Sequence, residues 1–222
     1  MRQVRSDKSN VAWFALAECI SRGEKERALG VYRLLSHSFD DCALKVQLEA
    51  DILWSFRDEG AIKKYQEAAE MFAKERRLLE ATAVFEHVVT LVPRSLYALD
   101  TLIQLYVAMG QPIKALSHTF TFLEVAAANK EVSRMRDVVQ QLEQVLEPEP
   151  RAQLYQQFTI ALLKQDAPSH ELVLVSMKKA IDLLLMHNQS RALQQFLSQI
   201  QAMNQRYYQQ ACIFIENDKD TN

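Results

Sequence analysis

The residues of this chain that could do chemistry are scattered along it. No two of its histidines are spaced i and i+4, and no glutamate precedes a histidine by three residues. Those spacings place metal ligands on one face of a helix, so nothing here supports a helical zinc or di-iron site. We expect the histidines to cap helix C-termini or to lie at the surface. They are His37, His87, His118, His170 and His187.

The cysteines and glycines form no reactive motif either. Cys19, Cys42 and Cys212 are far apart and have apolar neighbours, which is typical of small buried thiols in a reducing compartment. Cys19 could act as a nucleophile with a distant histidine, but it occupies a position expected in the core. The four glycines are too scattered to build a loop around a phosphate. We therefore expect no enzyme activity, with no catalytic residue, no cofactor and no metal.

The charge pattern gives no sign of a nucleic-acid or membrane protein. The 26 basic and 28 acidic residues leave a net charge of -2, so no global field attracts nucleic acid or anionic lipid. The polar N-terminus lacks an apolar run of signal-peptide length. The most apolar segment, 172–186, is interrupted by charged residues and is too short to cross a bilayer. We expect a cytoplasmic protein.

Composition and periodicity predict an all-α fold of about twelve helices. Only 4 glycines and 5 prolines occur, too few for the many turns of an all-β protein. Apolar residues recur three and four positions apart along most of the chain. We expect Ser9 or Asn10 to cap the first helix, and Asp40 or Asp41 to cap a helix that ends near Phe56. Short connections predict antiparallel neighbours. Pro148–Pro150 is expected to end a helix.

A repeat of 34 residues is clearest in 62–122. Small or apolar residues in its first copy are matched 34 positions later, which is typical of stacked helix-turn-helix units. The first copy contains Tyr65, Ala69, Phe72, Ala81, Phe85 and Val88, and the second contains Leu99, Ile103, Tyr106, Ala115, Thr119 and Phe122. In the second helix of each pair, a small residue permits close approach and an aromatic residue fills the gap to the next pair.

This pattern resembles the tetratricopeptide repeat, with Ala81, Phe85, Val88 and Pro93 at the family's second-helix positions. The resemblance is strongest over 62–128, fair over 12–35 and faint in a degenerate helical part at 131–216. It departs from the family at Thr119, where an aromatic is expected, and in the additional helix of 41–56, which breaks strict alternation. The resemblance implies a single domain over 1–222 that forms a right-handed α-solenoid of antiparallel helix pairs.

In this family the first helix of each pair lines a concave groove that takes up a peptide or helix from a partner. The resemblance therefore implies a non-catalytic protein-interaction scaffold whose partner is another protein. The family's groove positions fall here on Lys63, Gln66, Glu70, Lys74, Tyr97, Asp100, Gln104 and Ala108. Gln66 and Glu70 do not suit the clamping of a terminal carboxylate, since Glu70 would repel it. Ordinary solvated helix surface is an equal alternative for all eight residues.

Two further functions stay open at this point. A helical repeat can bind nucleic acid, although neither net charge nor a basic stripe favours it here. The apolar C-terminal helices could instead associate with a second copy, giving a structural adaptor and a homo-oligomer. The 15 glutamines between Gln140 and Gln210 are expected to be exposed helix surface, with a polar contact surface as the alternative.

Overall fold

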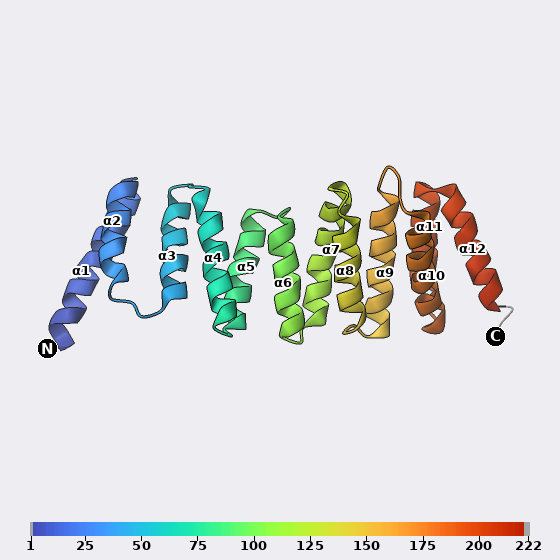
Figure 1. The fold of residues 1–222 in the computed structure, drawn as a ribbon, viewed down its shortest axis with the longest axis horizontal. Coiled ribbons are helices and arrows are strands. Elements are labelled where there is room, and N and C mark those ends of the chain that lie inside the picture. Colours follow the sequence, from blue (N-terminus) through green and yellow to red (C-terminus); the bar gives the residue numbers. More distant parts are fainter. Residues whose placement is uncertain (1, 220–222) are drawn as a thin grey trace. The chain divides into compact units, whose positions relative to one another are not determined.

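A computed structural model describes the backbone of residues 2–219 and the side chains of residues 11–216. It confirms the predicted all-α fold: the described residues form twelve helices and no strand (Figure 1). No helix among them is long and apolar enough to cross a membrane. The helices are α1 (Arg2–Ser21), α2 (Lys25–Ser36), α3 (Cys42–Ser55), α4 (Gly60–Lys74), α5 (Leu78–Leu91), α6 (Leu96–Ala108), α7 (Pro112–Ala128), α8 (Val132–Glu143), α9 (Pro148–Leu163), α10 (His170–Met186), α11 (Ser190–Met203) and α12 (Gln205–Lys219).

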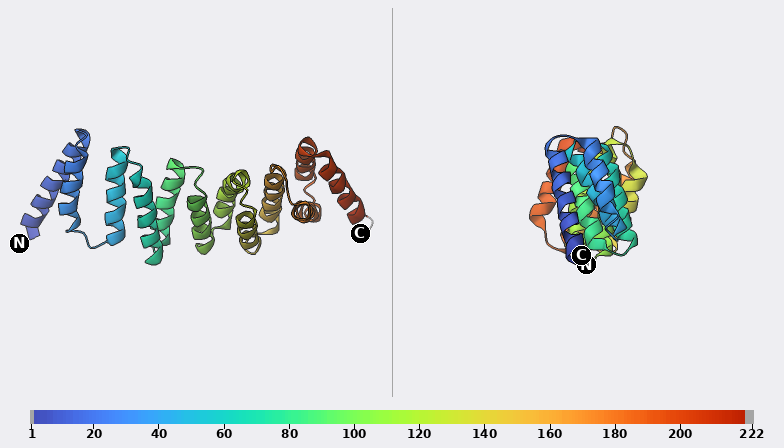
Figure 2. Two further views of the ribbon diagram at one scale, coloured as in Figure 1. Left: turned by 45° about the horizontal axis from the view of Figure 1, so that its top comes forward. Right: turned by 90° about the vertical axis from the view of Figure 1, so that its left-hand side faces the viewer.

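The chain divides into two compact units. The first unit is Met1–Pro93, which contains α1 to α5, and the second unit is Arg94–Asn222, which contains α6 to α12. Consecutive helices pack against each other in both units. Figure 2 shows how α4 and α5 in the first unit, and α7 to α9 in the second, each turn back beside the preceding helix, as expected for antiparallel pairs.

The residues of the 34-residue repeat form the core. All twelve of them, from Tyr65 to Phe122, are at most 2% exposed. Thr119 is buried in place of the expected aromatic residue, and its hydroxyl donates a hydrogen bond to the Ala115 carbonyl at 2.8 Å. This backbone bond satisfies the hydroxyl within its own helix, so threonine can be accommodated there. The prediction that these positions lie in the core is confirmed.

One turn geometry recurs between helices. At six positions a residue that follows the end of a helix adopts a positive φ. The N–H of this residue donates a hydrogen bond to the carbonyl three residues earlier, and the N–H of the next residue donates to the carbonyl five residues before itself. This is the Schellman motif, which satisfies the last carbonyls of a helix. The left-handed residues are Gly23, Arg57, Arg76, Gly110, Lys130 and Asn188. Gly23 and Arg57 are 34 residues apart, and so are Arg76 and Gly110, so the turn repeats with the same period as the core.

Within the second unit the helices form two rows. Contacts join α7 to α9, α9 to α11, and α10 to α12. Ion pairs also join α6 to α8, and α8 to α10. We call the side formed by α6, α8 and α10 the even face of the second unit. Of these three helices, α6 contains the first-helix positions of the second repeat copy.

The structure corrects two expected helix ends. The first helix begins at Arg2, so Ser9 and Asn10 lie inside α1 and do not cap it. Both residues have intermediate helix propensity, and the helix formers before them extend the segment. Pro148 begins α9 and does not merely end the preceding helix, because proline suits the first turn, where its missing N–H is not needed. The cap predicted at Asp41 is confirmed, since its carboxylate accepts a hydrogen bond from the Leu44 N–H at 2.9 Å.

Candidate functional site

The eight predicted groove residues lie on two helices, four in each unit. On α4 of the first unit, Lys63 and Lys74 are exposed while Gln66 and Glu70 are half-buried. On α6 of the second unit, Tyr97, Gln104 and Ala108 are exposed and Asp100 is half-buried. None of the eight side chains is fully buried. One groove shared by both helices stays a prediction.

On the even face of the second unit, Asp100 belongs to a polar cluster. Its carboxylate accepts hydrogen bonds from Gln104 Nε2 at 3.1 Å and from Arg134 Nη2 of α8 at 3.0 Å. Arg134 also donates to Glu131 at 2.9 Å, and its guanidinium lies over the Phe122 ring at 5.7 Å. The bond to Asp100 is the largest of the effects that raise the pKa of Arg134. The Arg134 guanidinium therefore remains charged at neutral pH.

Arg134 was missed by the sequence analysis. It follows Asp100 by 34 residues, so the repeat period places the two side chains at equivalent points of neighbouring pairs. An acidic and a basic residue at equivalent positions is the signal that could have indicated this contact.

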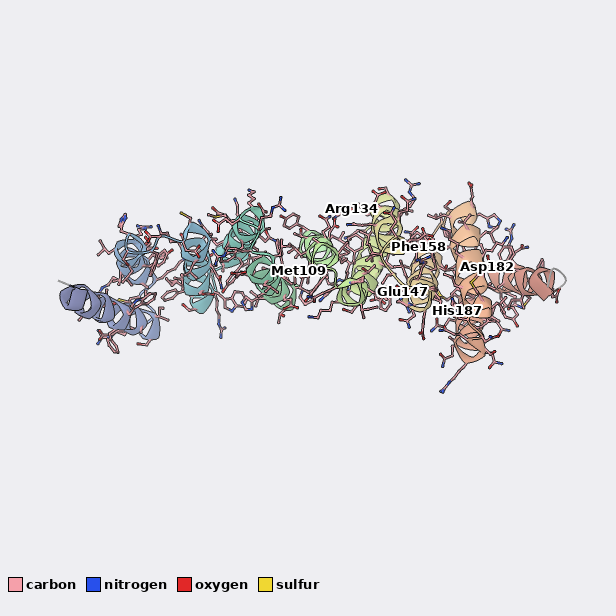
Figure 3. The ribbon with its side chains drawn as sticks, turned by 90° about the horizontal axis from the view of Figure 1, so that it is seen from below. Met109, Arg134, Glu147, Phe158, Asp182 and His187 are labelled. Carbon is pink, nitrogen blue, oxygen red and sulfur yellow. The ribbon has the colours of Figure 1, made fainter. Side chains whose placement is uncertain are left out.

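A cleft opens on the same even face between α8 and α10. It has a volume of about 100 Å³, and the intervening helix α9 supplies Tyr155 and Phe158 to its lining (Figure 3). Arg136, Val139, Gln140 and Glu143 of α8 line one side, and Leu172, Val175, Ser176 and Lys179 of α10 line the other. The lining combines an apolar base with charged edges, which suits a peptide side chain.

Lys179 spans this cleft. Its Nζ lies 2.8 Å from Glu143 Oε1 and 2.8 Å from the Tyr155 hydroxyl, and 4.9 Å from the centre of the Tyr155 ring. Burial alone would lower the pKa of Lys179, but the bonds to Glu143 and Tyr155 outweigh it and raise the pKa. Burial raises the pKa of Tyr155 to about 12. The cleft thus contains a neutralised ion pair and one further cation, Arg136, which forms no ion pair among the described residues.

The glutamine-rich region supplies a second, more polar surface in the second unit. A pocket of about 450 Å³ lies between α9 and α11. Gln153, Gln156, Gln189 and Gln195 line it together with Glu149 and Arg191. Part of the glutamine enrichment is therefore gathered at one pocket.

The histidines and cysteines lie where helix packing places them. His37 and His187 follow α2 and α10 at their C-caps, as expected. The other three contact tyrosines: His87 packs edge-on against Tyr65, His118 stacks on Tyr106, and His170 Nδ1 lies 3.1 Å from the Tyr207 hydroxyl. Cys19 is buried in the core, as predicted, but Cys42 is exposed and Cys212 is half-buried, so the expectation of buried thiols is wrong for these two. In the described part of the chain, no three His, Cys, Asp or Glu side chains form a metal-binding group.

Comparisons with known proteins name no family for this chain. No protein-family model matches it, and no curated protein matches it. One similar solved structure is described as MamA RS-1 ArsTM double mutant, with 14% identity over 82% of this chain and 97% of that one, at a TM-score of 0.26. The helical-repeat fold described above follows from the helices themselves.

Proposed function

We propose that this chain is a non-catalytic, cytoplasmic scaffold of the tetratricopeptide type that binds a peptide or helix of a partner protein. The repeat type is supported by the 34-residue period, which appears in the buried core, in the turns at Arg76 and Gly110, and in the Asp100–Arg134 pair. Neighbouring pairs in such an array expose one continuous row of first helices, on which partners bind.

The observation that carries the proposal is the cleft between α8 and α10. It lies on the even face, where first helices line the binding groove of such repeats, and it offers an apolar base beside the cation of Arg136. An occupant with an apolar side chain and a nearby carboxylate would suit both features. Val175, which is 50% exposed at the edge of the cleft, would then be covered.

Site-specific photocrosslinking tests this assignment. A photoreactive phenylalanine analogue replaces Val175 at the cleft, and the matched control places it at Ile113, an exposed residue of α7 in the same unit. We expect discrete crosslinked proteins at position 175 that are absent at position 113 and are reduced by Arg136→Glu. Identical crosslinking patterns at the two positions would show that the cleft is not the binding surface.

The residues predicted on α6 extend this test along the same face. Replacing both Tyr97 and Gln104 by alanine removes two exposed side chains without disturbing a buried one. We expect a pull-down with this variant to lose partners that the unmodified chain recovers. Recovery of the same partners at wild-type levels would exclude α6 from the groove.

A further inference from the structure

The first unit contains an apolar pocket between α1 and α3. It has a volume of about 240 Å³. Leu16 and Ile52, both at most 5% exposed, form its base. Trp13, Ile20 and Leu48 also line it, and Trp13 is 37% exposed. The pocket can therefore hold one large apolar side chain, and Trp13 would be covered when it is filled.

A second pocket, polar in character, lies between α3 and α5. It has a volume of about 320 Å³, and the buried Tyr65 of α4 forms part of its base. The Tyr65 hydroxyl donates to Asp51 Oδ1 at 2.6 Å, and the ring of His87 packs edge-on against the Tyr65 ring at 4.9 Å. These contacts orient the Asp51 carboxylate at the edge of the pocket.

Asp51 lines both pockets, because α3 separates them. Gln47 and Asp51, four residues apart, face the polar pocket, while Leu48 and Ile52 on the adjacent row face the apolar one. Since the two pockets lie on opposite sides of one helix, their centres are about 10 Å apart, one interhelical distance. A ligand that fills both must cross α3 at Asp51.

The polar pocket has an excess of negative charge. Asp51 forms no ion pair with any described residue, and among these residues its side chain accepts a hydrogen bond only from Tyr65. Glu80, on the opposite wall, pairs with Arg77 at 3.1 Å, but Arg77 also pairs with Asp41 at 2.6 Å and Glu75 at 3.3 Å. One guanidinium therefore serves three carboxylates. A cation at Asp51 would be attracted by this uncompensated charge.

We propose that this face of the first unit binds a basic peptide segment of a partner protein. A large apolar side chain of the segment enters the pocket beside Trp13, and a lysine or arginine that enters the polar pocket, whose centre is about 10 Å away, pairs with Asp51. Three residues of extended chain span this distance. The site is distinct from the cleft between α8 and α10, and its ligand has the opposite charge.

Trp13 provides a direct readout, because Trp13 and Trp54 are the two tryptophans of the chain. The experiment uses the full chain with Trp54→Phe, so that emission reports on the apolar pocket alone. The probe is a 12-residue glycine-serine peptide that carries one leucine and, three residues later, one arginine. We expect a saturable blue shift of Trp13 emission. A peptide with glutamate in place of the arginine should bind at least threefold more weakly.

Variants separate the two pockets. Asp51→Asn should weaken binding of the arginine peptide about three- to tenfold, the range for a partly exposed charged pair. The matched control is Glu67→Gln on α4, which removes the same charge from a residue that lines neither pocket and should leave the affinity unchanged. Ala17→Leu, at an exposed position of the apolar pocket, should abolish the shift by filling it.

Three results would overturn the proposal. The first is that the arginine and glutamate peptides bind with equal affinity, or that the arginine peptide binds equally well to the chain with and without Asp51→Asn. The second is the absence of saturable binding both by Trp13 emission and by calorimetry with the unmodified chain. The third is a blue shift that depends on protein concentration without peptide and accompanies a dimeric mass, which would make a second copy the occupant.

Discussion

The repeated turns predict a pair of opposite stability changes. Arg76, between α4 and α5, has a φ of 64°, and Gly110, between α6 and α7, has a φ of 67°. The left-handed conformation costs a residue with a Cβ atom about 1–2 kcal/mol, whereas glycine loses about 0.5–1 kcal/mol more chain entropy on folding. Arg76→Gly should therefore raise the free energy of unfolding by about 0.5–1 kcal/mol.

Gly110→Ala is the reverse change. A Cβ atom at Gly110 would meet no other atom within 4 Å, so no steric clash adds to the backbone cost. We expect Gly110→Ala to lower the free energy of unfolding by about 0.5–1 kcal/mol, equal in size to the increase from Arg76→Gly. Asn188→Gly should raise the free energy of unfolding by less than Arg76→Gly does, because asparagine tolerates the left-handed region better than arginine does.

Urea denaturation followed by circular dichroism measures these changes, with thermal midpoints as a second assay. A change of this size corresponds to a shift in Tm of about 1–4 °C for a chain of this length. Arg76→Ala is the control, since it removes the same charge but keeps the Cβ atom in the left-handed conformation. If Arg76→Ala stabilises as much as Arg76→Gly, or if Gly110→Ala is neutral, backbone strain does not govern these turns.

Three other changes test the packing and the charges. Ala81→Leu places extra methylene groups at a fully buried helix contact and should cost about 1–3 kcal/mol; an unchanged Tm would contradict the need for a small residue there. A double-mutant cycle with Asp100→Ala and Arg134→Ala should give a coupling energy of about 0.5–1 kcal/mol, since both side chains are partly exposed; a coupling near zero would mean that the pair does not link α6 to α8. Burial raises the pKa of Tyr32 and of Tyr155 from 10.0 to about 12, so their neutral phenols stabilise the fold fully below pH 10, and that stabilisation is lost as pH rises through about 12. Urea midpoints should fall over this range, with a smaller fall in Tyr155→Phe.

The sequence predicted the core better than the surface. A buried helix contact restricts the side chains it accepts, so Ala81 and Ala115, 34 residues apart and both fully buried, show the period directly. Glycine is the residue type that indicates a left-handed turn, as at Gly23 and Gly110, whereas Arg76 and Lys130 adopt the same φ without a residue type that signals it. Helix propensity and cap residues predicted the ends of helices less accurately, as the start of α1 at Arg2 shows.

The candidate surfaces depend on contacts that a single helix cannot reveal. Lys179 interrupts an apolar segment in the sequence, yet in the structure it bridges Glu143 and Tyr155 across the cleft. Asp51 appears as an ordinary polar residue of α3, and its position between two pockets depends on α1 and α5 packing on either side. Pairings at the repeat period, such as Asp100 with Arg134, are the part that a sequence can anticipate.

The succession of helix pairs has a consequence for how the protein forms. Within each unit, the helices contact partners one or two places away along the chain, so contact order is low and each contact closes a short loop. Folding can then begin at any hairpin and spread to its neighbours, without waiting for distant segments to meet. During synthesis, α1 and α2 can pair while later helices are still being added, and each new helix finds a formed surface on which to pack.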